Sequence, residues 1–419
     1  TLTIPELSVF KAQLEGTGKR EISSTMAFVR ILATLLRDKN LGKRVVPIVP
    51  DEARTFGMEG MFRQLGIYSS EGQLYEPEDS DELAAYKESK TGQVLEEGIN
   101  EAGAFAAWMA AATSYSTHQY TLLPFYIYYS MFGFQRIGDL AWAAGDLQAK
   151  GFLLGGTAGR TTLNGEGLQH QDGHSHLLSS TVPNCISYDP AYAFELAVII
   201  QRGLQHMYVE QAPVYYYLTL MNEAYQHPAM PEGVETDIVK GMYLLETLGE
   251  SSAPKVRLLG SGTLLPEARE AARRLVDDYG VQVQVYSVTS YTELARDVQD
   301  CQRAMLLNPL DDTATCHVSE VLNNQAWGDA PVIAVSDYVK ALPEQLRVAI
   351  HAPLRVLGTD GFGRSDTREQ LRAFFEVDSR FIRYSALSEL VSVGHMQLDL
   401  KAVREQLGID ANKSNPRNH

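Results

Sequence analysis

The chain has 419 residues, of which 45% are hydrophobic, and a formal net charge of −16 at pH 7. This composition predicts a soluble globular protein of roughly two or three domains. The acidic excess disfavours nucleic-acid binding, which requires clustered Lys and Arg. Apolar runs stop well short of the roughly 18 residues of a membrane span and no charged-then-apolar leader opens the chain, so we expect a cytoplasmic protein without a membrane span.

The N-terminal segment is polar and interrupted by Pro and Gly, so we expect residues 1–20 to be a linker from a domain absent from this chain. A helix capped near Ser23 and a buried strand over 44–50 are predicted next. Asp51 and Glu52 follow the carboxyl end of that strand, where ligands bind in open parallel α/β sheets. Both are therefore candidate site residues, with helix capping as the open alternative.

A strongly acidic, polar stretch from Tyr68 to Lys90 predicts a long surface loop. Long loops in compact domains often cover active sites, and a simple solvated excursion is the alternative interpretation.

The most informative stretch is Gln93–Ser116, where seven alanines from Ala102 to Thr113 predict a closely packed, buried helix. Its apolar run contains a single carboxylate, Glu101. Among Ile99, Ala102 and Phe105 this group would lose hydration, which would raise its pKa and prepare it to share a proton with a bound base. An ordinary glutamate that satisfies amides in the first helical turn is the alternative.

A second buried strand is predicted over 120–129, and aromatic residues gather at its end. Such rings either hold a flat heterocycle by stacking or belong to the core. The aromatic cluster consists of Tyr126, Tyr128, Tyr129, Phe132 and Phe134.

After a helix over 134–150 and a strand over 151–155 comes a glycine-rich segment, 155–176, with many titratable groups. Its glycines let backbone approach a ligand, and Glu166 and His170 can move protons, so we favour an acid/base site. His174 and His176 would orient the loop. Zinc binding by the three histidines is the alternative, but Gly173 interrupts the helix that an i, i+4 pair requires, so we predict no metal site in this chain.

A helix over 189–207 and a strand over 214–220 follow. An irregular linker over 222–236 comes next, with a predicted domain boundary near Glu235, and a second α/β block follows it. That block alternates strands at 256–260, 281–286 and near Val332 and Val356 with helices such as 265–278. We therefore predict an α/β fold of two three-layer α/β/α domains with largely parallel sheets. Gly358–Ser365 contains a fragment similar to GxGxxG that is out of register with a dinucleotide fingerprint, so we interpret it as a turn.

Long motifs throughout the chain closely resemble the family of bacterial homodimeric pyruvate dehydrogenases, the decarboxylating first component of that complex. The motifs that carry the resemblance are PDEARTFGMEGMFRQLGIY, GQVLEEGINEAGAFAAWMAAATSYS, FYIYYSMFGFQRIGDLAWAAGD, GRTTLNGEGLQHQDGHSH, YSVTSYTELARDVQDCQR and LGTDGFGRSDTREQLRAFFEVD.

The resemblance implies a build like transketolase, with 21–235 as the pyrimidine-binding domain and 236–419 as the C-terminal domain, and with thiamine diphosphate and Mg as cofactors. Glu101 matches the glutamate that faces the cofactor's aminopyrimidine nitrogen and promotes its imino tautomer. By the same resemblance, the pyrimidine pocket is lined by Ile99, Tyr129 and Phe132. The polar groups around the reacting carbon and the substrate carboxylate are Glu52, Glu166 and His170. The stretch from Tyr68 to Lys90 overlaps a loop that orders over the active centre in the family.

The sequence departs from the family pattern because no Gly-Asp-Gly is followed by a distant Asn-Asn, so the metal and diphosphate site is expected outside this chain. A fragment, a proteolysis product and a natural subunit that meets a separate diphosphate-binding chain all remain open. The resemblance implies a homodimer that uses pyruvate and transfers its acetyl group to the lipoyl acyltransferase component. The alternatives are a transketolase-like ketol transfer and a non-catalytic assembly or binding module.

Overall fold

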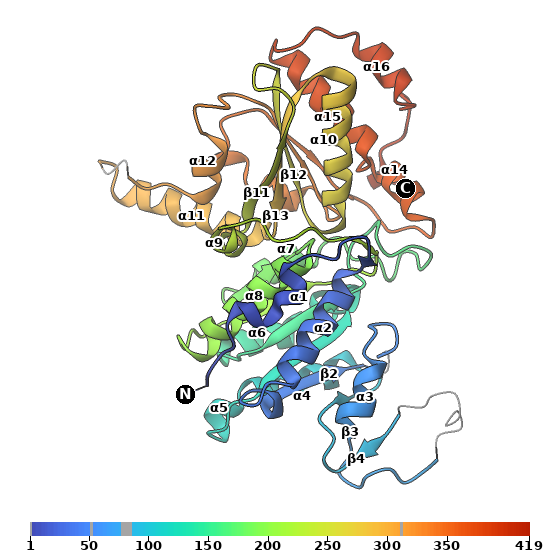
Figure 1. The fold of residues 1–419 in the computed structure, drawn as a ribbon, viewed down its shortest axis with the longest axis vertical. Coiled ribbons are helices and arrows are strands. Elements are labelled where there is room, and N and C mark those ends of the chain that lie inside the picture. Colours follow the sequence, from blue (N-terminus) through green and yellow to red (C-terminus); the bar gives the residue numbers. More distant parts are fainter. Residues whose placement is uncertain (1, 51–52, 77–85, 311–312) are drawn as a thin grey trace. The chain divides into compact units, whose positions relative to one another are not determined.

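A computed structural model describes residues 2–50, 53–76, 86–310 and 313–419. The chain forms two compact units (Figure 1). Unit 1 comprises 1–158, 178–187 and 192–230, and unit 2 comprises 159–177, 188–191 and 231–419. The chain therefore passes between the units several times, which a single boundary near Glu235 does not represent. The domain limits implied by the resemblance stay a prediction.

Unit 1 is built on a six-stranded sheet with the order β5-β2-β6-β7-β9-β8. The pairs β5/β2, β2/β6, β6/β7 and β7/β9 are all parallel, so these strands end at one edge of the sheet. The strands are β2 Val45–Val49, β5 Leu95–Glu96, β6 Leu123–Tyr129, β7 Phe152–Gly156, β8 Cys185–Tyr188 and β9 Tyr215–Thr219. The predicted strands in this unit are thereby confirmed, whereas β5 and β8 were not predicted.

Helices accompany this sheet, as expected for parallel strands joined by crossover connections. They are α2 Ser24–Leu36, α3 Glu59–Leu65, α4 Glu101–Ala112, α5 Ser114–Thr117, α6 Phe134–Asp146 and α8 Ala193–Tyr208, with short 3-10 turns η2 Gly42–Arg44 and η3 Ser130–Phe132. The helix α7 Ser175–Ser180 is divided, with residues 175–177 in unit 2 and 178–180 in unit 1.

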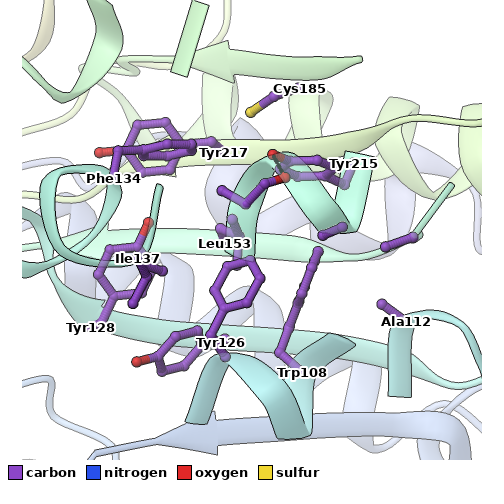
Figure 2. Packing of buried hydrophobic residues seen from close by; sticks show 14 of the residues in the cluster. Trp108, Ala112, Tyr126, Tyr128, Phe134, Ile137, Leu153, Cys185, Tyr215 and Tyr217 are labelled. Atoms are coloured by element: carbon purple, nitrogen blue, oxygen red, sulfur yellow. Dashed lines mark hydrogen bonds between the residues drawn. The ribbon is translucent and has the colours of Figure 1, made fainter. Parts of the chain in front are cut away.

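The core of unit 1 lies between the sheet, α4 and α6, and Figure 2 shows its aromatic packing. Trp108 of α4 is fully buried, and its indole Nε1 donates a hydrogen bond to the carbonyl of Phe152 in β7 at 3.1 Å. The side chains of Tyr126 and Tyr128 project from β6 into the same layer, with ring centroids 4.9 Å apart. The Trp108 bond joins α4 to β7, and the Phe105 ring of α4 lies edge-on to the Tyr126 ring at 6.4 Å between centroids, so α4 is fixed to two strands of the sheet.

The helix predicted over 93–116 is shorter than expected, because α4 begins only at Glu101. Asn100 caps it by accepting a hydrogen bond from the Gly103 amide at 3.0 Å, which satisfies a free helix-terminal donor. The preceding residues pair with β2 instead, and the Gln93 side chain donates to the Gly42 and Val45 carbonyls. Tertiary strand pairing has therefore overridden local helix propensity in this segment.

The segment 2–20, expected to be a linker, is a folded part of unit 1. It contains η1 Leu7–Phe10 and α1 Lys11–Leu14, and the Phe10 side chain is fully buried. The predicted irregular linker over 222–236 also contains structure, because β10 Tyr225–Gln226 pairs with β1 Glu21–Ile22. The N-terminal segment is ordered because its apolar side chains are buried. The segment over 222–236 is ordered because it pairs with a strand far earlier in the chain, which local sequence does not indicate.

The ends of the acidic loop meet in a two-stranded sheet of β3 Ile67–Tyr68 and β4 Glu88–Ser89. Tyr75 and Tyr86 both donate hydrogen bonds to the Glu88 carboxylate, at 2.9 Å and 3.0 Å. Residues 77–85 lie outside the described part of the chain, so the loop's role as a cover stays a prediction.

Unit 2 contains a five-stranded sheet with the order β11-β13-β12-β14-β15, parallel except for β11. The strands are β11 Met242–Leu248, β12 Lys255–Gly260, β13 Gln282–Val288, β14 Val332–Val335 and β15 Leu354–Leu357. Its helices are α9 Glu235–Lys240, α10 Leu265–Tyr279, α11 Tyr291–Leu307, α12 His317–Leu322, α13 Ala341–Glu344, α14 Arg368–Phe375, α15 Ser379–Ser392 and α16 Leu400–Gln406, with 3-10 turns η4 Gly262–Leu264, η5 Arg347–Ala349 and η6 Pro416–Asn418. The predicted α/β class is confirmed, and β11 is an edge strand that the sequence did not reveal. Within the described ranges, no helix is long and apolar enough to cross a membrane.

Candidate functional site

Glu101 is the first residue of α4, and its side chain is only 11% exposed. The predicted burial is therefore confirmed, but two predicted neighbours are wrong, because Ile99 is 73% exposed and Ala102 is also exposed. Instead, Glu101 Oε1 forms an ion pair with Nη1 of Arg136 at 3.0 Å. The other carboxylate oxygen, Oε2, accepts no hydrogen bond from the described residues.

Arg136 comes from the first turns of α6 and connects the carboxylate to an aromatic group. Its guanidinium lies 4.3 Å from the centroid of the Phe132 ring, a cation–π distance. The Phe132 ring is 6.1 Å from that of Tyr129, which in turn is 5.4 Å from Phe56. The structure thus brings together the predicted residues Glu101, Tyr129 and Phe132, and adds Arg136, which sequence reasoning missed.

The predicted aromatic cluster divides into two parts with different surroundings. Tyr126, Tyr128 and Phe134 are buried in the core, whereas Tyr129 and Phe132 are only partly buried. Tyr129 ends β6 and Phe132 ends η3, so both lie where the parallel strands end, the usual position of ligands in such sheets. The core interpretation is therefore confirmed for Tyr126, Tyr128 and Phe134, whereas stacking of a flat ring on Tyr129 and Phe132 stays a prediction.

Tyr126 carries a buried hydroxyl that is close enough to the Glu101 carboxylate to be affected by its charge. Burial, and after it the negative charges of Glu101 and Glu97, raises the pKa of Tyr126 well above its usual value. The hydroxyl has no hydrogen-bond partner among the described residues. A buried polar atom without a partner is unusual in folded proteins and marks this place as a candidate binding site.

Asp51 and Glu52 lie outside the described residues, so their candidate roles stay predictions. The strand that precedes them, β2, is parallel to β6 in the same sheet.

The other predicted site residues belong to unit 2, in the segment 159–177. His170 Nδ1 lies 3.6 Å from a carboxylate oxygen of Glu166, and the two side chains are 20% and 52% exposed. The two side chains are thus adjacent and partly exposed, and the His170 Nδ1 atom that faces Glu166 is buried.

The neighbouring histidines have other surroundings. His174 lies 3.4 Å from the guanidinium of Arg160, and His176 is buried edge-on against the Tyr338 ring at 4.8 Å. Burial lowers the pKa of His176, so it is neutral at neutral pH. No group of acidic, Cys and His side chains among the described residues could hold a metal ion.

Two known protein families match this chain, each over a different range of residues. Residues 2–228 match the family described as the pyruvate dehydrogenase E1 component middle domain, and residues 241–378 match the transketolase-like C-terminal domain. The pyruvate dehydrogenase E1 components of Cupriavidus necator and Escherichia coli are 59% and 58% identical over 99% of the chain, which covers 46% of each relative. The chain therefore spans about half the length of the curated relatives it matches.

Solved structures show the same fold at much lower sequence identity. Transketolase from Campylobacter jejuni matches 90% of the chain and 49% of its own, with a TM-score of 0.62 and 18% identity. Transketolase from Leishmania mexicana matches 94% of the chain and 49% of its own, with a TM-score of 0.63 and 17% identity. At these identities the likeness concerns the fold alone.

Proposed function

We propose, because this chain belongs to the family of the pyruvate dehydrogenase E1 component, that it supplies the pyrimidine-binding side of a thiamine-diphosphate site that decarboxylates pyruvate. The acetyl group would pass to the lipoyl group of the acyltransferase component. The observation that carries the proposal is the nearly buried Glu101 carboxylate beside partly exposed aromatic rings at the carboxyl edge of a parallel sheet.

The residues of unit 1 fit the pyrimidine end of this cofactor. Glu101 Oε2 accepts no hydrogen bond from the described residues and is free to meet a ring nitrogen. Tyr129 and Phe132 offer ring surfaces that are not wholly covered, and the buried Tyr126 hydroxyl has no described partner. Ile99 is exposed and so would contribute apolar surface only against a bound group or a partner.

Thiamine diphosphate, with Mg held outside this chain, would supply a nucleophilic carbon and an electron sink for decarboxylation. Glu101 would hold or release a proton at the ring nitrogen, and its low exposure would strengthen that interaction. Arg136 would fix the orientation of Glu101 through Oε1, while Tyr129 and Phe132 would pack on the ring and exclude water.

In unit 2, His170 and Glu166 would move protons around the substrate and the lipoyl group. Their exposure suits a site that a large acyl acceptor must reach. Glu52 is proposed to join them on the basis of the resemblance alone.

The proposal is tested by Glu101→Gln in the complete enzyme. The amide keeps the shape of the side chain but cannot share the proton, so we expect proton exchange at the cofactor's C2 to slow by at least about 10²-fold. Folding should be preserved, because Gln can still accept the hydrogen bond from Arg136. Glu97→Gln, an exposed neighbour, is the matched control and should leave exchange unchanged.

Near-normal exchange in Glu101→Gln would remove Glu101 from this role. The chain would then be better described as a non-catalytic binding module, or its acid/base group would have to be sought elsewhere.

A further inference from the structure

The glycine-rich turn near the end of β15 has a specific neighbour. Residues 359–368, here called the clamp segment, hydrogen-bond to the loop 159–177 that carries Glu166 and His170, and both segments belong to unit 2. Ser365 Oγ donates to the Gly165 carbonyl at 2.5 Å, and the Gly165 amide donates to the Asp366 carbonyl at 3.1 Å. Both bonds are made by Gly165, so they attach the backbone directly before Glu166 to the clamp segment.

Gln171 follows His170 directly and is completely buried. Its Nε2 donates to the Leu163 carbonyl at 2.5 Å, and its Oε1 accepts from the Arg364 amide at 2.7 Å. One side chain therefore closes the His170 loop on itself and ties it to the clamp segment. Removing it would leave a buried carbonyl and a partly buried amide without their partners, which destabilises a structure more than a lost surface contact does.

Gly363 of the clamp segment lies directly against the Gln171 side chain. A Cβ atom at this position would lie 2.5 Å from Gln171 Oε1 and 2.9 Å from Gln171 Cβ, closer than unbonded atoms allow. The requirement for glycine at position 363 therefore comes from the close approach of the clamp segment to the loop.

Arg160 makes a second connection at the start of the loop. Its buried guanidinium donates from Nη1 to the Thr359 carbonyl at 2.6 Å and to the Gly361 carbonyl, and from Nε to the Gln171 carbonyl at 3.5 Å. Burial lowers the pKa of Arg160, while Asp172, Asp337 and Asp360 offset part of that effect. A buried guanidinium is unfavourable unless its N–H groups are hydrogen-bonded. Here those N–H groups donate to carbonyls of both the loop and the clamp segment.

We infer that the clamp segment and Gln171 position His170 and Glu166 for proton transfer, so that Gln171 is a positioning residue. The inference rests on the proposed function for the role of His170, but the clamp contacts themselves do not. Displacement of a catalytic group by about 1 Å can lower turnover about 10²-fold, so a loosened loop is expected to affect the rate strongly.

The test is Gln171→Ala in the complete enzyme, with two measurements. Hydrogen exchange followed by mass spectrometry should show faster exchange, by about tenfold or more, in peptides that contain the Gly165 and Arg364 amides. Turnover with the lipoyl substrate should fall about 10-fold to 10²-fold, while thiamine diphosphate affinity and the KM for pyruvate change less than about twofold.

Gln284→Ala is the matched control, because Gln284 is also nearly buried and accepts one hydrogen bond, from the Tyr286 hydroxyl at 2.9 Å. This variant should leave loop exchange and turnover unchanged. Gly363→Ala approaches the same contact from the other side and should reproduce both effects of Gln171→Ala, which keeps the test decisive if Gln171→Ala folds poorly.

Unchanged exchange in both clamp variants would overturn the clamp itself. Faster exchange with wild-type turnover would overturn the positioning role. If instead His170→Ala retains full lipoyl turnover, the proposed role of His170 fails and the positioning role fails with it, whereas the exchange data still report the clamp.

Discussion

At the scale of single residues, Glu101 shows how function and stability separate. Its ion pair with Arg136 joins a side chain that is 11% exposed to one that is 50% exposed. Ion pairs with an exposed partner contribute little to stability, about 0–1 kcal/mol. In our proposal the pair matters instead because it orients the Glu101 carboxylate, whose second oxygen accepts no hydrogen bond from the described residues.

His170 is the residue whose role divides most clearly between catalysis and loop structure. His170→Ala in the complete enzyme should retain thiamine diphosphate affinity, because the side chain contacts Glu166 and belongs to the lipoyl-facing loop in our proposal. Turnover with the lipoyl substrate should fall by about 10²-fold or more, the usual contribution of a general acid or base.

Added zinc should neither restore nor raise the activity of His170→Ala. Wild-type turnover would assign His170 to loop structure, and a zinc-dependent gain would revive the metal interpretation of the three histidines.

At the scale of elements, His227 joins three segments of unit 1. Its Nδ1 accepts from the Ala193 amide at the start of α8 at 2.9 Å, and its Nε2 donates to the Ile22 carbonyl of β1 at 3.0 Å. Its ring also stacks on Tyr225 of β10, at 4.9 Å between centroids. This arrangement requires the neutral imidazole, since a protonated Nδ1 could not accept the amide hydrogen.

Burial lowers the pKa of His227 from 6.5 to about 4, so protonation favours the unfolded chain. The stabilisation is fully present above pH 6.5 and is lost as pH falls toward about 4. Between pH 7 and pH 5 this group should lower the free energy of unfolding by about 2 kcal/mol.

Urea unfolding of the wild type and His227→Gln at both pH values measures this contribution. Gln does not titrate in the range, so the pH dependence should shrink by about 2 kcal/mol. Equal pH dependence in the two proteins would show that His227 is not the titrating group.

At the scale of the whole molecule, the chain spans 46% of the length of relatives such as the Escherichia coli protein. Unit 1 carries a largely apolar groove of about 690 Å³ beside α4, lined in part by Val46, Leu95, Ala107, Ala110 and Leu122. Exposed apolar surface of this kind is typical of faces that meet other protein parts, as our proposal of a separate diphosphate-binding half requires.

The isolated chain should therefore fold into its two α/β units but fail to decarboxylate pyruvate. Without the diphosphate and Mg contacts, several charge-assisted interactions are lost, each worth roughly 1.5–3 kcal/mol, so cofactor affinity should fall by orders of magnitude. Calorimetry with thiamine diphosphate and Mg, together with measured carbon dioxide release, checks this. Micromolar binding with decarboxylation would show that the chain holds the complete site.

The sequence alone determined the features that depend on near neighbours. The alternation of buried strands and amphipathic helices specified the α/β class, and an isolated carboxylate at the mouth of an alanine-rich run specified a buried Glu101. Likewise, Glu166 and His170 are four residues apart in one loop, so their adjacency follows from local geometry.

Only the tertiary structure decided the contacts between residues distant in the chain. The sequence does not indicate that Arg136 would pair with Glu101, that Gln93 would pair with the region of β2 rather than extend α4, or that Gln171 would meet Arg364 across 193 positions. These contacts form because the assembled sheet brings strand ends and loops together, and buried polar groups then bond to whichever partners the fold places within reach. Local propensity cannot specify such partners, because the free energy that selects them arises only once the core has packed.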